Sequence, residues 1–203
     1  ARLAERRRAV LAMAGLGEHH ARLTGDLPLG WKQRLALGTA MLHEPPLLFL
    51  DEPTSGVDPI SRRSFWELID RLAAGGTTVF VSTHYMEEAE YCHRLALMNR
   101  GRVIALDAPG ALRATMTEPL LAITADHGPP VAQALQGAPL VLEAALFGRD
   151  VHVMVEDAAA AREYLPALLA GKGLPIRGIE PVRPALEDVF VALVRREGGA
   201  VLG

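Results

Sequence analysis

Two short apolar runs with a helix between them constrain the fold of this chain more than any other feature. The first run is Leu47–Leu50, and the second, Thr77–Ser82, is rich in β-branched residues. Asp58-Pro59 opens the helix, since Asp is a favoured N-cap and Pro is favoured at the first helical position. This spacing predicts two fully buried parallel strands joined by a right-handed crossover in an α/β fold. The helix is expected to bury Phe65, Leu68, Ile69 and Leu72 and to end at Gly75-Gly76.

Three candidate catalytic side chains fall just past the ends of these strands. Asp51 and Glu52 follow the first run, and His84 follows the second. Open α/β sheets bind ligands at this edge, so the three side chains are expected to meet there. One acid can hold a magnesium ion through water while the next orients a water for attack on a phosphate. The alternatives are an Asp-Glu turn that only ends a strand and a histidine that only makes a loop hydrogen bond.

The residues before the first strand are predicted to be helical. The pattern indicates an amphipathic helix from Arg2 to Leu16, a polar loop over 18–26, and a second helix from Gly30 to Leu42. The turn Leu27–Trp31 opens directly into the second helix. Its amide groups and the helix dipole therefore form a ready anion site.

The rest of the chain has a different rhythm. A short helix at 86–91 precedes a hairpin whose turn is Asn99-Arg100-Gly101. Strands are then expected at 120–125, 140–146, 151–155 and 174–179, and helices at 130–136 and 158–169. This β-α-β-β-α-β order is typical of ferredoxin-like α+β folds. A closing helix, Ala185–Arg196, is expected to bury Leu186, Val189, Phe190 and Leu193. Pro and Gly near 117–119 favour two domains, residues 1–116 and 117–203.

Composition excludes several classes of protein. Before Met116 the chain has 14 Lys and Arg and 13 Asp and Glu, and after it 7 Lys and Arg and 11 Asp and Glu. Neither half is therefore basic enough to offer a surface to nucleic acid. One cysteine, Cys92, excludes a disulfide framework and a Cys-based zinc site. The sequence contains no apolar run near the roughly 18–20 residues that span a bilayer.

Four motifs occur in an order that resembles the nucleotide-binding domain of ABC (ATP-binding cassette) ATPases, which are P-loop NTPases. They are a signature turn at Leu27–Trp31, a Walker B strand with its glutamate at Leu47–Glu52, a D-loop at Ser55–Asp58, and the switch histidine His84. Leu27 lies 24 residues before Asp51, and His84 lies 33 after it, separations that fit the family. The two helices before the Walker B strand would be the remnant of its helical subdomain.

The ending of the chain carries a narrower resemblance. Pro184–Leu193 is similar to the last segment of ATPase subunits that serve ABC-2 type exporters, and residues 117–203 look like their accessory domain. The signature and Walker B segments also resemble multidrug-efflux ATPases built from two fused cassettes.

The resemblance implies ATP and Mg²⁺ as ligands. Glu52 would be the general base or water positioner, Asp51 the magnesium-side acid, and His84 the γ-phosphate contact. The signature turn would complete the ATP site of a partner cassette, and Asp58 would couple the two sites. The residues implied to bind nucleotide are therefore Leu27, Pro28, Leu29, Gly30, Trp31 and Asp58.

Two departures from the family pattern stand out. The usual signature is Leu-Ser-Gly-Gly-Gln, whereas Pro28, Leu29 and Trp31 occupy the Ser, first Gly and Gln positions, so this site is expected to be weak or asymmetric. A Walker A loop needs Gly-x-x-x-x-Gly-Lys-[Ser/Thr], and neither Lys32 nor Lys172 lies in one. The chain, which begins with Ala rather than Met, is therefore expected to be the C-terminal part of a cassette and inactive alone.

The resemblance also implies partners and a location. A second ABC ATPase domain would pair with this one, as a homodimer or a fused pair, and ABC-2 type permease subunits would cross the membrane. The protein would be cytoplasmic, peripheral on the inner membrane, and ATP hydrolysis would drive export of a small molecule such as a drug. The alternatives are a non-transport ABC ATPase and a catalytically inactive binding or regulatory fragment.

Overall fold

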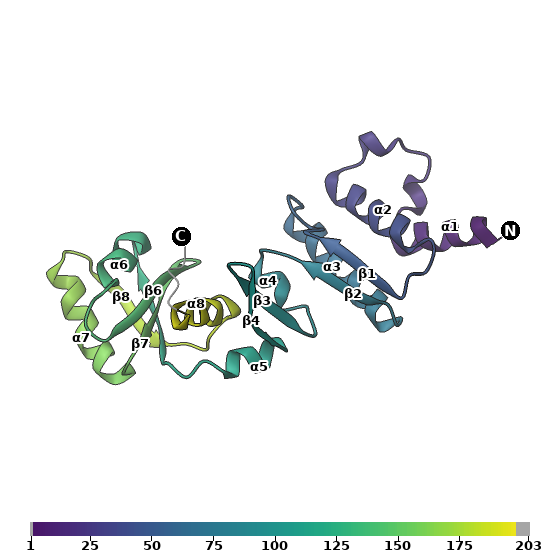
Figure 1. Ribbon diagram of the computed structural model, residues 1–203. Helices are drawn as coiled ribbons and strands as arrows, with labels where there is room; N and C mark the ends of the chain where they lie inside the picture. Colours follow the sequence, from purple (N-terminus) through teal and green to yellow (C-terminus); the bar gives the residue numbers. More distant parts are fainter. Residues whose placement is uncertain (1, 198–203) are drawn as a thin grey trace. The chain divides into compact units, whose positions relative to one another are not determined.

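The computed structural model describes residues 2–197 of the 203-residue chain (Figure 1). These residues form two compact units that divide between Tyr91 and Cys92. The boundary predicted after residue 116 falls inside the second unit. There, helix α5 (Pro109–Ala114), which the sequence analysis did not predict, packs against the C-terminal helix α8 (Leu186–Arg196) and buries Leu112.

Two packed helices begin the first unit. Helix α1 (Arg2–Met13) ends three residues before its predicted end at Leu16, because Gly15 has a left-handed φ of +70°. Helix α2 (Leu29–Met41) begins one residue before its predicted start, and the polar loop between the helices contains two 3₁₀ turns, η1 (Gly17–His19) and η2 (Thr24–Asp26). Gly38 allows the close approach, because a Cβ there would lie 2.7 Å from Cγ1 of Val10.

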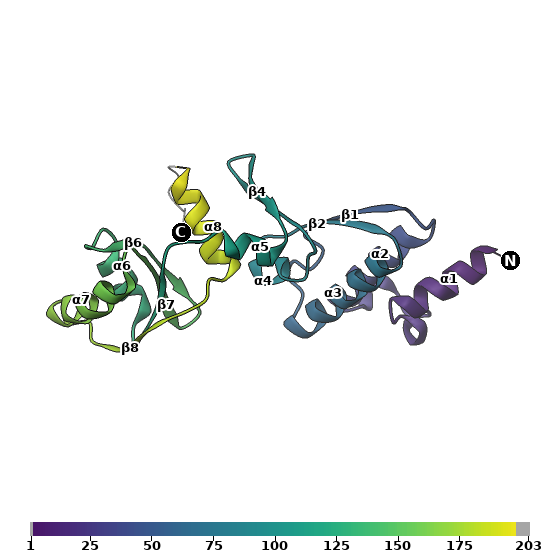
Figure 2. The ribbon, with the colours of Figure 1, turned by 90° about the horizontal axis from the view of Figure 1, so that it is seen from below.

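The predicted crossover follows these helices. Strand β1 (Leu47–Asp51) pairs in parallel with β2 (Thr78–Ser82), and α3 (Pro59–Ala74) runs along one side of them (Figure 2). Asp58 caps α3 by accepting a hydrogen bond of 2.9 Å from the Ser61 amide. Helix α4 (Met86–Ala89) completes the unit. The side chains that α3 buries are the predicted Phe65, Leu68, Ile69 and Leu72, together with Trp66.

The prediction that both strands are fully buried was wrong. Leu48 is buried, but Phe49 is 69% exposed and Phe80 is 58% exposed. Phe49 and Phe80 are register partners on one face of the pair, with ring centroids 5.7 Å apart. Helix α3 covers the other face, and no described residue buries these two rings. The two apolar runs therefore predicted the strands correctly, but they did not show whether each face of the strands is buried.

The second unit opens with the predicted hairpin. Strand β3 (Leu95–Asn99) pairs in antiparallel fashion with β4 (Arg102–Asp107). Arg100 and Gly101 both have positive φ, +48° and +76°, as a tight two-residue hairpin turn requires.

A four-stranded antiparallel sheet forms the body of this unit. Its element order is β5 (Leu120–Ala125), α6 (Gly128–Leu135), β6 (Val141–Phe147), β7 (Asp150–Val155), α7 (Ala158–Gly171) and β8 (Ile176–Pro181). The strands pair in the order β6-β7-β5-β8. All six elements occur where the sequence predicts them, with every end within two residues of its predicted position. Helices α6 and α7 cover one face of the sheet through a continuous apolar core.

Helix α8 covers the opposite face of that sheet. Residues 151–155 of β7 are all buried, because both faces of this strand are covered. Val151, Val153 and Val155 pack in the core under α6 and α7, and Met154 packs on the side of α8. Nδ1 of His152 lies 2.9 Å from Oδ1 of Asp188, which joins β7 to α8. Of the four α8 residues predicted to be inward, Leu186 and Val189 are buried, but Phe190 and Leu193 are half-buried. The other buried residues of α8 are Asp188, Ala192 and Val194, because this helix also packs against β4 and α5.

A carboxylate before β5 fastens the end of α8. Glu118 accepts hydrogen bonds from Arg195 (3.1 Å) and Arg196 (2.7 Å). Burial alone would raise the pKa of Glu118, but the hydrogen bonds from Arg196 and Thr117 outweigh it, so this pKa lies below its ordinary value. The stabilisation that the ionised Glu118 gives to the folded unit is therefore complete above the pKa of Glu118 in the unfolded chain. It is lost as the pH falls through the pKa of Glu118 in the folded chain.

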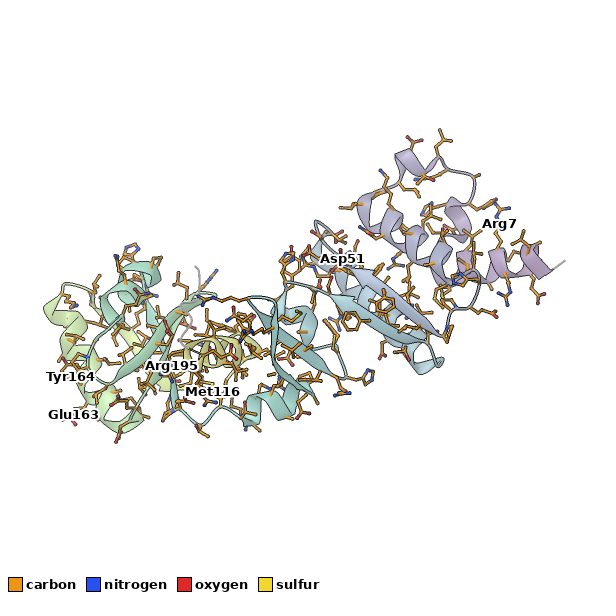
Figure 3. The ribbon with its side chains drawn as sticks, in the orientation of Figure 1. Arg7, Asp51, Met116, Glu163, Tyr164 and Arg195 are labelled. Atoms are coloured by element: carbon orange, nitrogen blue, oxygen red, sulfur yellow. The ribbon has the colours of Figure 1, made fainter. Side chains whose placement is uncertain are left out.

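We expect Glu118→Gln to lower the stability of this unit by about 1 kcal/mol at pH 7. The difference from the unchanged chain should shrink as the pH falls through the folded-state pKa of Glu118, and it should vanish once the carboxyl is protonated in both states. Hydrogen-exchange protection of the α8 amides measures the effect. Glu163→Gln on exposed α7 is the matched control (Figure 3). An equal loss at pH 7 and at a pH below the folded-state pKa of Glu118 would show that the charge of Glu118 is not what matters.

Among residues 2–197, no helix combines the length and the apolar character needed to cross a membrane.

Candidate functional site

The candidate site is built at the carboxyl ends of β1 and β2, where Figure 3 labels Asp51. Asp51 and Ser82 are register partners at these ends, and the Ser82 hydroxyl donates a hydrogen bond to Oδ1 of Asp51. The amide of Glu52 donates to the backbone oxygen and to Oγ of Ser82, both at 3.1 Å. Ser82, which the sequence analysis did not single out, therefore holds both carboxylate-bearing residues at one edge.

Glu52 and His84 form a pair at this edge. Oε2 of Glu52 lies 3.3 Å from Nδ1 of His84, and their side chains are 49% and 53% exposed. Glu52 has a left-handed φ of +41°, which is uncommon outside glycine and occurs where the surrounding structure holds a residue in place. The proximity expected from the sequence is thus observed. A carboxylate and an imidazole that share one open edge can together orient a water and hold a proton.

The signature turn lies at the start of α2. Pro28 is the N-cap, and no side chain caps the helix, so its first amides are open to a ligand by position. Leu27 is buried against Ala14 and Leu16, and Trp31 packs half-buried on the same cluster. Leu29 is 45% exposed. Within the turn, Leu27 and Trp31 therefore contribute to the helical core, and Pro28, Leu29 and Gly30 present the free end.

The D-loop packs directly against this turn. Gly56 has a φ of +72°, and a Cβ there would lie 3.3 Å from Cδ2 of Leu29. Asp58 follows as the exposed N-cap of α3, and the hydroxyl and backbone amide of Ser61 hold the pKa of that carboxyl below its usual value. The signature turn and the D-loop thus form one continuous surface.

We expect Gly30→Ala to destabilise the first unit by about 1 kcal/mol, because overpacking exceeds the gain in helix propensity. A Cβ on Gly30 would lie 2.9 Å from Cβ of Ser61, so α2 and α3 would have to separate. Urea unfolding followed by tryptophan fluorescence measures the change. Gly17→Ala, where an added Cβ meets no atom within 4 Å, is the control. Equal midpoints for the two variants would contradict the close contact.

A cavity of about 170 Å³ lies beside Asp51, between α2 and β1. Its walls include Gln33, Leu37, Phe49 and Phe65. Polar groups thus border it at Gln33 and Asp51, and the rest is apolar.

Comparison with known proteins decides the relationship. The family described as "AAA domain, putative AbiEii toxin, Type IV TA system" matches residues 24–88. The "Probable multidrug ABC transporter ATP-binding protein YbhF" of Escherichia coli (strain K12) is 54% identical over 100 residues, 49% of this chain and 17% of YbhF. The "Nod factor export ATP-binding protein I" of Paraburkholderia xenovorans (strain LB400) is 40% identical over 85% of this chain and 55% of its own length. The chain is a homologue of ABC transporter ATP-binding proteins.

Two further similarities agree with this relationship. The "Daunorubicin resistance ATP-binding protein DrrA2" of Streptomyces coeruleorubidus is 36% identical over 81% of this chain and 52% of its own. The solved structure of cbiO1 from Clostridium perfringens, part of the ABC transporter complex cbiONQ, matches with a TM-score of 0.52 and 30% identity. The match covers 55% of this chain and 45% of the cbiO1 chain. About half of this chain therefore shares the α/β fold of ABC ATPases.

The chain spans only a part of these ABC relatives, from 17% of YbhF to about half of the other two. The two lysines of the chain, Lys32 and Lys172, lie in different units. Lys32 is in the first turn of α2, and Lys172 follows α7, where its Nζ donates to the backbone oxygen of Ala134 at 3.2 Å. In the sequence, neither lysine lies in the Gly-x-x-x-x-Gly-Lys-[Ser/Thr] segment that a Walker A loop requires.

The sequence analysis missed a buried polar cluster next to the candidate site. Glu88 of α4 is 1% exposed, and Thr54 is also 1% exposed. No sequence signal marks Glu88, because Glu87 and Glu90 flank it in the same short helix and only packing shows which carboxylate is enclosed.

Proposed function

We propose that this chain is the C-terminal part of the ATP-binding and hydrolysing subunit of an ABC-type exporter. The observation that carries the proposal is the pair of Glu52 and His84, 3.3 Å apart beside Asp51 at the carboxyl edge of a parallel β-α-β unit. This edge is where open α/β sheets bind phosphate ligands, and the sequence order around it is that of the ABC motifs.

In this proposal each residue at the edge has its own task. Glu52 orients the attacking water and accepts its proton, and His84 contacts the γ-phosphate. Asp51 is the protein carboxylate on the side of Mg²⁺, an ion that is commonly held by one or two carboxylates, substrate phosphates and water. The exposed carboxylate of Asp51 and the half-buried hydroxyl of Ser82 beside it fit this role. Mg²⁺ would neutralise charge on the phosphates, while the chain's own residues set the geometry.

The signature turn and Asp58 act across a dimer in this proposal. The free start of α2 at Pro28, Leu29 and Gly30 would face the ATP of a second ABC ATPase domain, with Leu27 and Trp31 supporting it from the helical core. Pro28 offers no hydroxyl to a phosphate, and Leu29 has less backbone freedom than glycine. This site is therefore proposed to be the weaker of two.

Residues 117–203 are proposed to form a small ferredoxin-like accessory domain, with the ATPase part ending at residue 116. Support comes from the element order β5-α6-β6-β7-α7-β8 and the pairing order β6-β7-β5-β8. The hairpin β3–β4 and α5 pack with this domain, although the sequence motifs group them with the ATPase part.

The proposed partners are a second cassette, fused or separate, and ABC-2 type permease subunits at the cytoplasmic face of the inner membrane. The names of the relatives include Nod factor export and daunorubicin resistance, which supports a small molecule such as a drug as the cargo. The net charge of −3 does not favour nucleic acid as a partner.

ATP turnover tests the proposal. The protein encoded by the complete reading frame around this chain should hydrolyse ATP with Mg²⁺, whereas the 203-residue chain alone should neither hydrolyse ATP nor bind it with micromolar affinity, because it holds no Walker A loop. Calorimetry and phosphate release measure both. Turnover by the chain alone would overturn the assignment of a partial cassette. If the complete protein does not hydrolyse ATP, the alternative of a catalytically inactive binding fragment is favoured. If it hydrolyses ATP but transports nothing, the alternative of a non-transport ABC ATPase is favoured.

A further inference from the structure

Glu88 is a buried carboxylate that the proposed mechanism does not use. Oε1 accepts a hydrogen bond of 2.5 Å from the Thr54 hydroxyl, and Oε2 accepts one of 2.6 Å from the Thr83 hydroxyl. Thr54 lies two residues after Glu52, and Thr83 immediately precedes His84. One side chain therefore ties together the two loops that carry the Glu52–His84 pair.

The turn around His84 is fixed on both sides. The Thr83 hydroxyl, which donates to Glu88, also accepts a hydrogen bond of 3.1 Å from the Tyr85 amide. The Tyr85 ring lies under the guanidinium of Arg62, whose Cζ is 4.1 Å from the ring centroid. His84 thus stands between two residues that the Glu88 cluster holds in place.

Arg62 extends this cluster to the D-loop. Its Nε lies 3.4 Å from Oε1 of Glu88, an ion pair without the alignment of a hydrogen bond. Its Nη2 donates to the backbone oxygen of Val57 at 3.4 Å, next to Asp58. Glu88 and Arg62 therefore join the loop after β1, which includes the D-loop, to the loop after β2 within the first unit.

We propose that Glu88, together with Arg62, is a positioning residue that holds Glu52 and His84 in one geometry and links that pair to the D-loop. This proposal rests on the proposed function, in which Glu52 and His84 act in ATP hydrolysis. Removing a hydroxyl donor or the charge frees one loop relative to the other. Because a misplacement of about 1 Å can cost about 100-fold in rate, the effect falls on the catalytic step more than on nucleotide affinity.

The first test needs no ATP. In the full 203-residue chain with labelled histidine, Glu52→Gln should shift the His84 ring signals in the NMR spectrum, because Glu52 touches that ring. In a Glu88→Gln background, the same Glu52→Gln change should shift them by less than half as much, while a Glu87→Gln background should leave the shift intact. Glu87 is the matched control because it is the exposed neighbour in α4. An undiminished shift in the Glu88→Gln background overturns the proposal.

A second pair of variants keeps the test decisive if Glu88→Gln fails to fold. Thr54→Val removes only the hydroxyl that donates to Glu88, and Thr54→Ser retains it. The shift caused by Glu52→Gln should shrink in the Thr54→Val chain and recover in the Thr54→Ser chain. Equal shifts in both would contradict the positioning role.

Kinetics supply the remaining arm. In the complete protein, Glu88→Gln should lower kcat by about 10- to 100-fold with little change in KM for ATP, and it should add little to the loss caused by Glu52→Gln. A loss of thermal stability with unchanged kcat would mean that Glu88 is only structural. If the unchanged complete protein shows no turnover, the proposed function fails, and the NMR arm alone decides whether Glu88 positions the pair.

Discussion

Replacing Glu52 with Gln in the complete protein should reduce ATP turnover by about 10²- to 10⁴-fold, the usual contribution of a positioned acid–base group. The amide keeps the shape of the side chain but cannot accept the proton of the attacking water. The backbone amide of Glu52 would still donate to Ser82, so the left-handed turn should persist. ATP affinity, measured by calorimetry, should therefore remain, and the closed dimer should accumulate.

The control for this experiment is Glu87→Gln, which removes an exposed carboxylate from α4 without touching the edge of β1 and β2. It should retain the activity of the unchanged protein. If Glu52→Gln kept most of the turnover, Glu52 would not be the general base, and the 3.3 Å contact with His84 would be structural. A loss of ATP binding in Glu52→Gln would point instead to disruption of the site.

Phe65→Ala should destabilise the first unit by about 3–5 kcal/mol, the range for removing a buried aromatic ring. Phe65 is 2% exposed on α3 and also forms part of the cavity beside Asp51. The deletion would enlarge that cavity and loosen α3 beneath the carboxyl edge. The effect is measured by urea unfolding.

Tryptophan fluorescence makes this measurement specific to the first unit, because Trp31 and Trp66 are the two tryptophans of the chain and both lie there. Ile60→Ala is the matched control on the same helix, since Ile60 is 82% exposed and should change the stability by less than about 0.5 kcal/mol. Similar losses for the two variants would contradict the packing around Phe65.

Much of the site could be predicted because it follows strand ends. Asp51, Glu52 and His84 lie at fixed offsets from two apolar runs, and parallel strands bring such residues to one edge. Ser82 and Glu88 could not be identified in this way. Their importance comes from hydrogen bonds to residues 30 or more positions away along the chain, such as Asp51 and Thr54.

The limits of the fold prediction have the same origin. Periodicity and turn residues located the β-α-β unit, the hairpin with Arg100 and Gly101, and all six elements of the β5–β8 sheet. The same patterns wrongly predicted that β1 and β2 are buried on both faces, because hydropathy reports what a side chain can pack against and not what covers it. Helix α5 was missed because six residues between Pro109 and Ala114 are too few to show a helical period.

The sequence by itself determined the order of elements, the caps of α3, the ABC motifs with their variant signature, and the absence of a Walker A loop from this chain. These are local properties, set by residues a few positions apart. Only the tertiary structure decided that α8 is enclosed by the sheet, β4 and α5, and that Leu27 and Trp31 support the signature turn from the helical core. It also decided that Glu88 joins the two loops that carry Glu52 and His84. Each of these depends on contacts between segments distant in sequence, and burial and pairing at that range arise only when the chain has folded.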